Sequence, residues 1–310
     1  GNLEDTVTIS KNAHGVEGST IYLGRGENVK LRDLLYGLML QSGNDAAAAI
    51  AEHIGGSVEG FADMMNDKAL EIGAKNTHFT NPHGLQNDSH YTTAYDLALI
   101  SAYAMKNPVF AQIVSTKYKK IPWEEKGTNR VLKNKNKILW DYEGGNGVKT
   151  GFTKNSGRCL VSAAKRNGMQ LVCVVLRCPD MFPDSMKLMD YCFAKYEQKR
   201  IIENGKYAGF VPVENGLKNG LHAYCHEDFF YPLSDTENVE VKITLDDRIK
   251  APVFRGMLIG RVEAWLDGKL IYASGLYAQE DIEANTFIYN LRRVLDGWNN
   301  AIIHMFDGTQ

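Results

Sequence analysis

Long apolar runs are missing from this sequence. No stretch of its 310 residues approaches the roughly 20 apolar residues that a helix needs to span a bilayer. An excess of one charge is missing too: the formal net charge is −2, and no lysine-arginine stripe is interleaved with aromatic residues, so nucleic-acid binding is not predicted. No secretory signal is visible, but the chain begins at Gly1 without an initiator methionine, so this absence leaves the compartment open.

Patterns typical of metal sites are also missing. The sequence has no H-E-x-x-H motif, and its five cysteines include no C-x-x-C pair. An odd number of cysteines argues against a regular disulfide framework. We therefore predict no metal and no cofactor, with free cysteines that serve as small core residues. The cysteines are Cys159, Cys173, Cys178, Cys192 and Cys225.

The first 198 residues mix helical and strand patterns. Residues 31–54 read as two helices broken at Ser42-Gly43-Asn44, with Asp45 as the N-cap of the alanine-rich second helix. Two apolar runs flank Asn167-Gly168, which is a strong hairpin signal. This mixture predicts an α/β domain with an antiparallel sheet. Further helices are expected at 60–71, 93–105 and 183–197.

Residues 199–284 read mostly as strands, and the tail reads as a helix. The run at 239–245 alternates apolar and polar residues, and Asp267-Gly268 predicts a second hairpin, so this part is predicted to be a small all-β domain. Residues 285–310 predict an amphipathic helix that docks on the β domain or, as we favour, lies in a membrane interface. Its apolar side holds Phe287, Ile288, Leu291, Val294, Leu295, Trp298, Ile302 and Met305; its polar side holds Arg292, Arg293, Asp296, Asn299 and Asn300.

Two tripeptides carry the chemistry, S-G-N at 42–44 and K-T-G at 149–151. Each alone is weak: the first could be an ordinary helix connection, and Lys149 could be a solvated lysine at a strand end. The K-T-G run also lacks the G-x-x-x-x-G-K-[ST] frame of a phosphate loop. In this order, however, they match two of the three sites of penicillin-binding serine enzymes.

The flanking sequence makes this resemblance specific. The segments EGSTIYLGRGE, LRDLLYGLMLQSGNDAAAAIAEHIGGSVEGFADMMN, THFTNPHGL and HYTTAYDLALI resemble the low-molecular-mass D-alanyl-D-alanine carboxypeptidases. The segment APVFRGMLIGRV and the final helix resemble that family's C-terminal β domain and membrane anchor. The resemblance covers essentially the whole chain. It implies a penicillin-binding fold over 1–198, a β domain over 199–284 and an anchor helix over 285–310.

The resemblance also implies roles for single residues. A substrate that ends in a free carboxylate needs a fixed cation and a hydroxyl donor, and Lys149 and Thr150 would supply them. Gly151 would let the substrate backbone lie close to the strand, and the Phe152 N–H would form half of an oxyanion hole. Ser42 would relay a proton to the leaving amine. Two further assignments concern side chains outside K-T-G: Asn44 would hold the substrate amide carbonyl, and His83 and His90 are read as structural.

The family's first motif, S-x-x-K on a helix, has no credible counterpart. The only match is Ser162 with Lys165, which lies on a predicted strand, where residues three apart point to opposite faces. We therefore reject it and expect the chain to begin after the nucleophile's helix; the alternative is a pseudoenzyme. Because that helix should fill a core, we also expect the 310-residue chain to fold poorly alone.

The sequence thus predicts a serine D,D-carboxypeptidase that acts on peptidoglycan pentapeptides outside the cytoplasmic membrane and is inhibited by β-lactams. One alternative is a non-catalytic module that binds stem peptides through Lys149. A serine β-lactamase ranks lower, because it should need neither the β domain nor the final helix.

Overall fold

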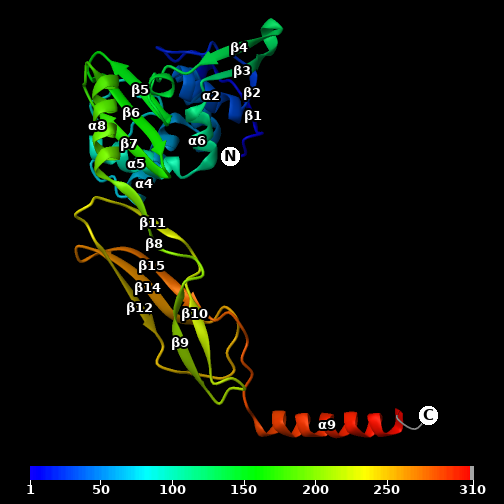
Figure 1. The fold of residues 1–310 in the computed structure, drawn as a ribbon. Helices are drawn as coiled ribbons and strands as arrows, with labels where there is room; N and C mark the ends of the chain where they lie inside the picture. Colours follow the sequence, from blue (N-terminus) through cyan, green and yellow to red (C-terminus); the bar gives the residue numbers. More distant parts are fainter. Residues whose placement is uncertain (308–310) are drawn as a thin grey trace. The chain divides into compact units, whose positions relative to one another are not determined.

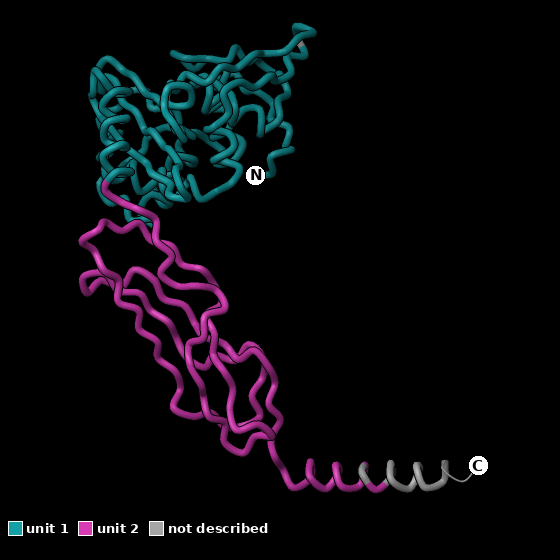
Figure 2. The backbone as a smooth tube through the Cα atoms, in the orientation of Figure 1, with its two compact units in different colours: residues 1–194 teal, residues 195–310 magenta. Residues whose placement is uncertain are grey.

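The computed structural model describes residues 1–307, without the side chains of residues 125, 297 and 299–307. The chain divides into two compact units, Gly1–Ala194 and Lys195–Gln310, drawn in different colours in Figure 2. Each unit has its own buried apolar core. The predicted sequence of an α/β part, a β part and a final helix matches the order of elements in Figure 1.

The helices of the first unit include every one that the sequence predicts there. Several begin at a side chain that accepts a hydrogen bond from the first turn: Ser57 from Gly60, Thr93 from Asp96 and Asn107 from Val109 and Phe110. The helices are α1 (Lys11–His14), α2 (Leu31–Gln41), α3 (Asn44–Gly55), α4 (Val58–Glu71), α5 (Ala94–Met105), α6 (Pro108–Ser115), the short 3-10 turn η1 (Glu124–Lys126), α7 (Ile138–Asp141) and α8 (Met181–Lys195).

The predicted break between α2 and α3 is confirmed at Ser42 and Gly43. Ser42 ends α2 in the left-handed conformation, with φ 59° and ψ 41°. The Gly43 N–H then donates to the Gly37 carbonyl at 3.2 Å, six residues back, so the turn after α2 is hydrogen-bonded to the helix that it ends. A Cβ on Gly43 would lie 2.8 Å from the Asp45 carboxylate, so only glycine fits between the two helices here.

The prediction that Asp45 caps α3 is wrong. The helix begins at Asn44, and its N-cap residue is Gly43, which offers no side chain. Asp45 lies inside the first turn, and its carboxylate accepts hydrogen bonds from Thr20, Ile21 and Leu23. It also accepts one from the Ala46 N–H of its own helix at 2.9 Å, so it joins the start of α3 to the segment before α2.

The sheet that carries K-T-G is antiparallel, with the order β5–β6–β7. The Asn167-Gly168 hairpin is confirmed: Arg166 pairs with Met169, and the two turn residues have φ of 49° and 84°. One sheet face packs against α8 through Leu160, Ala164 and Met189. Ala163 packs on the α6 side against Val114. The strands of this unit are β1 (Thr6–Thr8), β2 (Asn28–Lys30), β3 (Tyr118–Trp123), β4 (Thr128–Lys133), β5 (Gly145–Thr153), β6 (Gly157–Arg166) and β7 (Met169–Val175).

The second unit is an all-β fold followed by a helix. Its core joins strands from its separate small sheets, and the predicted Asp267-Gly268 hairpin joins β14 to β15. The run at 239–245 is a strand as predicted, but Val241 and Ile243 are 41% and 40% exposed because β12 lies at a sheet edge. The strands are β8 (Glu197–Ile202), β9 (Tyr207–Glu214), β10 (Gly220–Tyr224), β11 (Phe229–Leu233), β12 (Val239–Leu245), β13 (Ile249–Lys250), β14 (Leu258–Leu266) and β15 (Lys269–Tyr277).

The final helix, α9 (Phe287–Asp307), is amphipathic as far as its side chains are described. The predicted apolar residues from Phe287 to Trp298 are all exposed. Ile302, Met305, Asn299 and Asn300 lie outside the described side chains. Within the described residues, no single helix is long and apolar enough to cross a membrane; α5 and α6 reach that length and composition only as a pair bent by 107°.

Candidate functional site

Ser42 and Lys149, which are 107 residues apart in sequence, meet in the structure. The Lys149 Nζ donates to the Ser42 Oγ and to the Thr150 carbonyl oxygen, the latter at 2.7 Å. Ser42 is presented by the left-handed end of α2, and Lys149 by the edge strand β5. The fold therefore brings the S-G-N and K-T-G tripeptides together, as the predicted site requires.

The environment of Lys149 lowers the pKa of its ammonium group. Burial is the main cause, and the positive charge of Lys135 adds to it; together they lower the pKa of Lys149 from 10.5 to about 8. No carboxylate within the described residues forms an ion pair with this ammonium. A partly buried lysine without a carboxylate partner is suited to receive one from a ligand.

The pleat of β5 separates the side chains of K-T-G. Lys149 pairs across the sheet with Val161, on the face towards α6, whereas Thr150 pairs with Leu160, on the face towards α8. A Cβ on Gly151 would meet only the Cys159 Cβ, at 4.0 Å, so the strand is open on that side. Phe152 is 70% exposed. An extended ligand can therefore approach this part of β5 closely.

The Asn44 side chain is engaged within the protein. Its Nδ2 donates to the Glu17 carbonyl at 2.7 Å, its backbone N–H donates to the Ser19 carbonyl at 2.8 Å, and the residue is only 8% exposed. The predicted contact to a substrate carbonyl would need this same amide group. In the structure, Asn44 instead fastens the segment before α2 to the start of α3.

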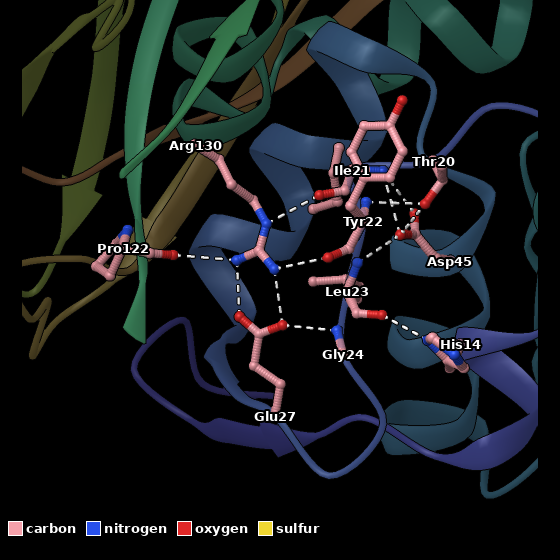
Figure 3. Close-up of polar contacts among 10 residues, drawn as sticks. All are labelled: His14, Thr20, Ile21, Tyr22, Leu23, Gly24, Glu27, Asp45, Pro122 and Arg130. Atoms are coloured by element: carbon pink, nitrogen blue, oxygen red, sulfur yellow. Dashed lines mark hydrogen bonds and ion pairs between the residues drawn. The ribbon is translucent and has the colours of Figure 1, made fainter. Parts of the chain in front are cut away.

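The carboxylate of Asp45 holds the next part of that segment (Figure 3). It accepts hydrogen bonds from the Thr20 hydroxyl, from the Ile21 N–H at 3.1 Å and from the Leu23 N–H at 3.1 Å. Tyr22, between these donors, has a positive φ of 62°. Asp45 is 1% exposed, and because these three partners are all donors, they match a carboxylate and not an amide.

A buried ion pair fixes the same segment from its other side (Figure 3). The Arg130 Nη1 and Nη2 each lie 2.7 Å from a Glu27 carboxylate oxygen, and both residues are buried. The guanidinium also donates to the carbonyls of Ile21, Tyr22 and Pro122, so its N–H groups all have hydrogen-bond acceptors. The hairpin β3–β4 is thereby tied to the segment that borders Ser42-Gly43-Asn44.

The rejected S-x-x-K match remains excluded by its geometry. Ser162 is fully buried in β6, and its Oγ donates to the Cys173 carbonyl at 3.3 Å. Lys165, three residues further along the strand, points to the opposite face and is exposed. His83 and His90 accept hydrogen bonds from the Leu85 and Thr80 N–H groups, in keeping with structural roles.

Two histidines of the second unit have a spacing that can bind a metal ion when it lies on a helix. His222 and His226 stand in H-x-x-x-H spacing, but on the strand β10 and the loop after it, not on one face of a helix. Within the described residues no group of three or more histidine, cysteine, aspartate or glutamate side chains is arranged to hold a metal ion.

Sequence reasoning missed a lysine-rich loop beside the site. Residues 133–137 read Lys-Asn-Lys-Asn-Lys, and the lysines are exposed while the asparagines are buried. The signal was present as a period-two alternation that continues past the end of β4. It was hidden because a run of charged residues ordinarily marks only a solvated surface.

Comparison with known proteins identifies both units. The D-alanyl-D-alanine carboxypeptidase family matches residues 2–180, and the C-terminal domain of penicillin-binding protein 5 matches residues 196–284. The chain is 32% identical to the D-alanyl-D-alanine carboxypeptidase DacF of Bacillus subtilis over 96% of this chain and 77% of that protein. It is 34% identical to DacA of Haemophilus influenzae, over 91% of this chain and 74% of that protein.

Solved structures agree with these matches. Penicillin-binding protein 5 from Haemophilus influenzae has a TM-score of 0.70 at 33% identity, covering 91% of this chain and 83% of that one. A peptidoglycan synthesis regulatory factor (PBP3) from Streptococcus pneumoniae has a TM-score of 0.74 at 25% identity, covering 91% and 86%. The predicted penicillin-binding fold with its C-terminal β domain is therefore confirmed, and the chain belongs to the D-alanyl-D-alanine carboxypeptidase family of serine peptidases.

Proposed function

We propose that Ser42 and Lys149, with the β5 residues that follow, form the carboxylate-binding half of this protein's active site. Membership of the family gives the reaction: a serine-type carboxypeptidase that removes the terminal D-alanine from peptidoglycan stem peptides and that binds penicillin. The observation that carries the proposal is the hydrogen bond between Lys149 and Ser42, at the open edge of the K-T-G strand. The proposal assigns no residue as the attacking nucleophile.

Lys149 binds the terminal carboxylate of the substrate. Its ammonium has no carboxylate partner among the described residues, so a substrate carboxylate would compensate a charge that burial disfavours. A charge-assisted hydrogen bond of this kind contributes on the order of 1.5–3 kcal/mol. The Thr150 hydroxyl is proposed as a second donor to the substrate, although its side chain leaves the strand on the other face.

Ser42 and the backbone after Lys149 act on the bond that breaks. Ser42, hydrogen-bonded to Lys149, passes a proton to the leaving amine of D-alanine. Gly151 leaves room for the substrate backbone, and the Phe152 N–H stabilises the oxyanion. Asn44 holds the substrate amide carbonyl through the second N–H of its Nδ2, because the first donates to the Glu17 carbonyl.

The test is release of D-alanine from a stem pentapeptide by the full-length natural protein. Replacing Lys149 by Gln removes the cation but keeps a hydrogen-bond donor, and we expect kcat/KM to fall by roughly 10- to 100-fold. Lys154→Gln is the matched control, because Lys154 is an exposed lysine in the turn after the same strand. Equal losses in both variants would contradict the assignment. Tight peptide binding without turnover by the unaltered protein would favour a non-catalytic binding module.

The remaining organisation is proposed from the same pattern. Residues 1–198 form the catalytic domain, 199–284 the β domain, and 285–310 a helix that lies on the outer face of the cytoplasmic membrane. Support comes from α9, where exposed apolar side chains share the helix with Arg292 and Arg293, which suit anionic headgroups. The exposed apolar residues are Phe287, Ile288, Leu291, Val294, Leu295 and Trp298.

A further inference from the structure

Positive charge is concentrated in one segment of the first unit. Residues 117–137 contain seven lysines against two glutamates, although the whole chain has a formal net charge of −2. The remaining basic residue of the segment, Arg130, is paired with Glu27 in the buried ion pair. The segment forms the hairpin β3–β4 and the loop before α7. A charged run ordinarily marks only a solvated surface, so the contacts of these lysines decide whether it is more than that.

Three of these lysines and two aromatic residues form one exposed surface, which we call the β3–β4 patch. The rings of Tyr118 and Trp140 pack edge to face, with their centroids 6.2 Å apart. The Lys133 Nζ lies 5.8 Å from both ring centroids, and the Lys117 Nζ lies 5.8 Å from the Trp140 centroid. Two cations therefore flank a pair of aromatic rings. The patch consists of Lys117, Tyr118, Lys120, Lys133 and Trp140, all of them exposed.

The pleat of the hairpin places Lys120 on the same face as the aromatic pair. Tyr118 pairs across the hairpin with Lys133, and Lys120 follows Tyr118 by two residues, so it lies about 7 Å further along the same face. Lys119, between them, points to the opposite face, where its Nζ lies 4.7 Å from the Tyr36 ring centroid. One face of the hairpin therefore carries the cations of the patch.

A buried asparagine holds the two ends of the hairpin together. The Asn134 Nδ2 donates to the carbonyls of Val114 and Thr116, at 3.2 and 3.1 Å, and its backbone N–H donates to the Lys117 carbonyl at 2.9 Å. Asn134 is 3% exposed. The backbones of Lys117 and Lys133 are thus fixed side by side, which reduces the entropy lost when a ligand binds.

The lysines of the patch are available to an anionic ligand. No ion pair joins Lys117, Lys120 or Lys133 to a carboxylate in the part of the chain that the structure describes. Lys117 and Lys120 are three residues apart, which is about 10 Å along an extended chain and more than one carboxylate spans. A ligand with repeated negative charges therefore fits the patch better than one small anion.

A hollow of about 600 Å³ adjoins the patch, and Lys133 and Trp140 form part of its wall. The C–H face of a sugar ring is apolar and packs on aromatic rings, whereas the hydroxyl groups at its edge need hydrogen-bond partners. The hollow offers an aromatic wall for the first and amide, ammonium and carboxylate groups for the second. Its other lining residues are Gln41, Asn134, Lys135, Lys137 and Asp141.

We propose that the β3–β4 patch binds an acidic polysaccharide, a chain of sugar rings that carry carboxylates. One sugar ring packs on Trp140 beside the hollow, and the carboxylates of this ring and its neighbours pair with Lys117, Lys120 and Lys133. Because Lys133 lies close to both aromatic rings, the acidic group that it meets is carried by the stacked sugar or the next one. A polyphosphate has charge but no ring to stack.

The form of the patch favours a polysaccharide over a membrane surface. Trp140 is 37% exposed, so its ring forms a wall, whereas an aromatic residue that inserts into a bilayer protrudes from the protein. The Gln41 Nε2 donates to the Lys133 carbonyl at 3.0 Å, so the patch adjoins the end of α2 directly before Ser42. The bound polymer would hold the protein beside its proposed active site, but the inference does not depend on the roles proposed for Ser42 and Lys149.

The test is isothermal titration calorimetry with the full-length natural protein. The probe is an oligomer of galacturonic acid, compared with the same oligomer methyl-esterified at its carboxylates. Esterification should weaken binding by at least about tenfold, and added salt should weaken only the binding of the acidic oligomer. Lys120→Gln with Lys133→Gln should weaken it about tenfold, at up to about fivefold for each exposed lysine. Trp140→Ala should weaken it about fivefold, and Trp140→Phe, which keeps an aromatic ring, should restore most of the affinity.

Lys11→Gln with Lys75→Gln is the matched control, because it removes the same charge from two exposed lysines outside the patch. This control should leave the affinity unchanged. Equal affinity for the acidic and esterified oligomers, or equal losses in the patch and control variants, overturns the proposal. Tighter binding of polyphosphate that Trp140→Ala leaves unchanged overturns it in favour of a polyanion without rings. Binding of phosphatidylglycerol vesicles through the same lysines, without binding of the oligomer, overturns it in favour of a membrane.

Discussion

Lys149 is proposed to bind a carboxylate through its ammonium group. This group loses its proton at a lower pH than an ordinary lysine. Its pKa is lowered to about 8, first by burial and then by Lys135, whereas an ordinary lysine titrates at 10.5. The charged form binds a carboxylate and the neutral form does not. The proposed site therefore has a built-in dependence on pH.

This dependence gives a first prediction. As the pH rises through about 8, Lys149 loses its charge, so kcat/KM for a stem pentapeptide should fall. Lys135→Gln removes a neighbouring positive charge, so the pKa of Lys149 should rise and the falling limb should move to higher pH. Rate profiles between about pH 6 and 10.5 measure both. A limb that stays in place in the variant would show that another group titrates.

Ser162 allows a second prediction at the same scale. Its hydroxyl is buried and hydrogen-bonded to the Cys173 carbonyl, so Ser162→Ala should leave the rate of penicillin acylation unchanged. The loss of one buried hydrogen bond should lower the free energy of unfolding by about 1 kcal/mol. Acylation kinetics and urea unfolding together provide the check. Abolished acylation in a folded variant would make Ser162 the nucleophile.

Single residues were unequally predictable from the sequence. The Ser42 to Lys149 contact spans 107 residues, so no local pattern could place the two side chains together; the family resemblance did. Asn44 was assigned to substrate on the same resemblance, but its hydrogen bond to Glu17 depends on a segment whose path the sequence does not specify. The lysine-rich loop at 133–137 was readable in the sequence as an alternation. Its position beside Gln41 and Ser42 could not be read from the sequence.

Between elements, the most consequential contact is the Arg130 to Glu27 ion pair. It joins the hairpin β3–β4 to the segment 20–24. On its other side, this segment donates hydrogen bonds to the Asp45 carboxylate (Figure 3). Ser19, directly before this segment, accepts the Asn44 N–H at its carbonyl. The geometry of Ser42-Gly43-Asn44 therefore depends on two parts of the chain that are distant in sequence, residues 19–24 and the hairpin β3–β4.

The third prediction follows from this dependence. Arg130→Met leaves the Glu27 carboxylate buried without its partner, so the free energy of unfolding should fall by about 3–5 kcal/mol. Arg248→Met is the control, because its pair with Glu214 is exposed at the arginine and should contribute at most about 1 kcal/mol. Urea unfolding monitored by circular dichroism measures both. Similar losses in the two variants would refute the structural role given to Arg130.

Elements were predicted well where the signal was local. Asn-Gly and Asp-Gly fixed both hairpins, because their residues tolerate the positive φ that such turns require. The α2–α3 break was also local, since serine and glycine end the helix there. The Asp45 cap failed for the opposite reason: the helix begins one residue earlier, at Asn44, and most of the hydrogen bonds to the Asp45 carboxylate come from a segment that only the folded chain brings near.

At the scale of the molecule, α9 gives a fourth prediction. Leu291→Asp with Trp298→Asp places charges on the exposed apolar side, so partitioning onto anionic lipid vesicles should fall by at least about tenfold, given roughly 1.5–3 kcal/mol for each large side chain buried. Asp296→Asn, on the polar side, should not weaken binding. Vesicle co-sedimentation of the full-length protein is the measurement. Equal binding by all three proteins would exclude the helix as the contact.

The order of the chain's parts was predictable because each has its own periodicity. Helical patterns, then alternating strands, then an amphipathic run were readable in turn, and the family matches at 2–180 and 196–284 follow the same division. The burial of β12 was not predictable, since alternation alone does not reveal that a strand lies at a sheet edge.

The most direct test of the central claim is the rate at which benzylpenicillin acylates the full-length natural protein, followed by intact-protein mass spectrometry. The unaltered protein should gain one penicilloyl group per chain. Lys149→Ala should gain it roughly 10- to 100-fold more slowly, because the penicillin carboxylate loses its cation. An unchanged rate in Lys149→Ala would contradict the carboxylate site, and an adduct mapped to Ser162 would contradict the assignment of the whole centre.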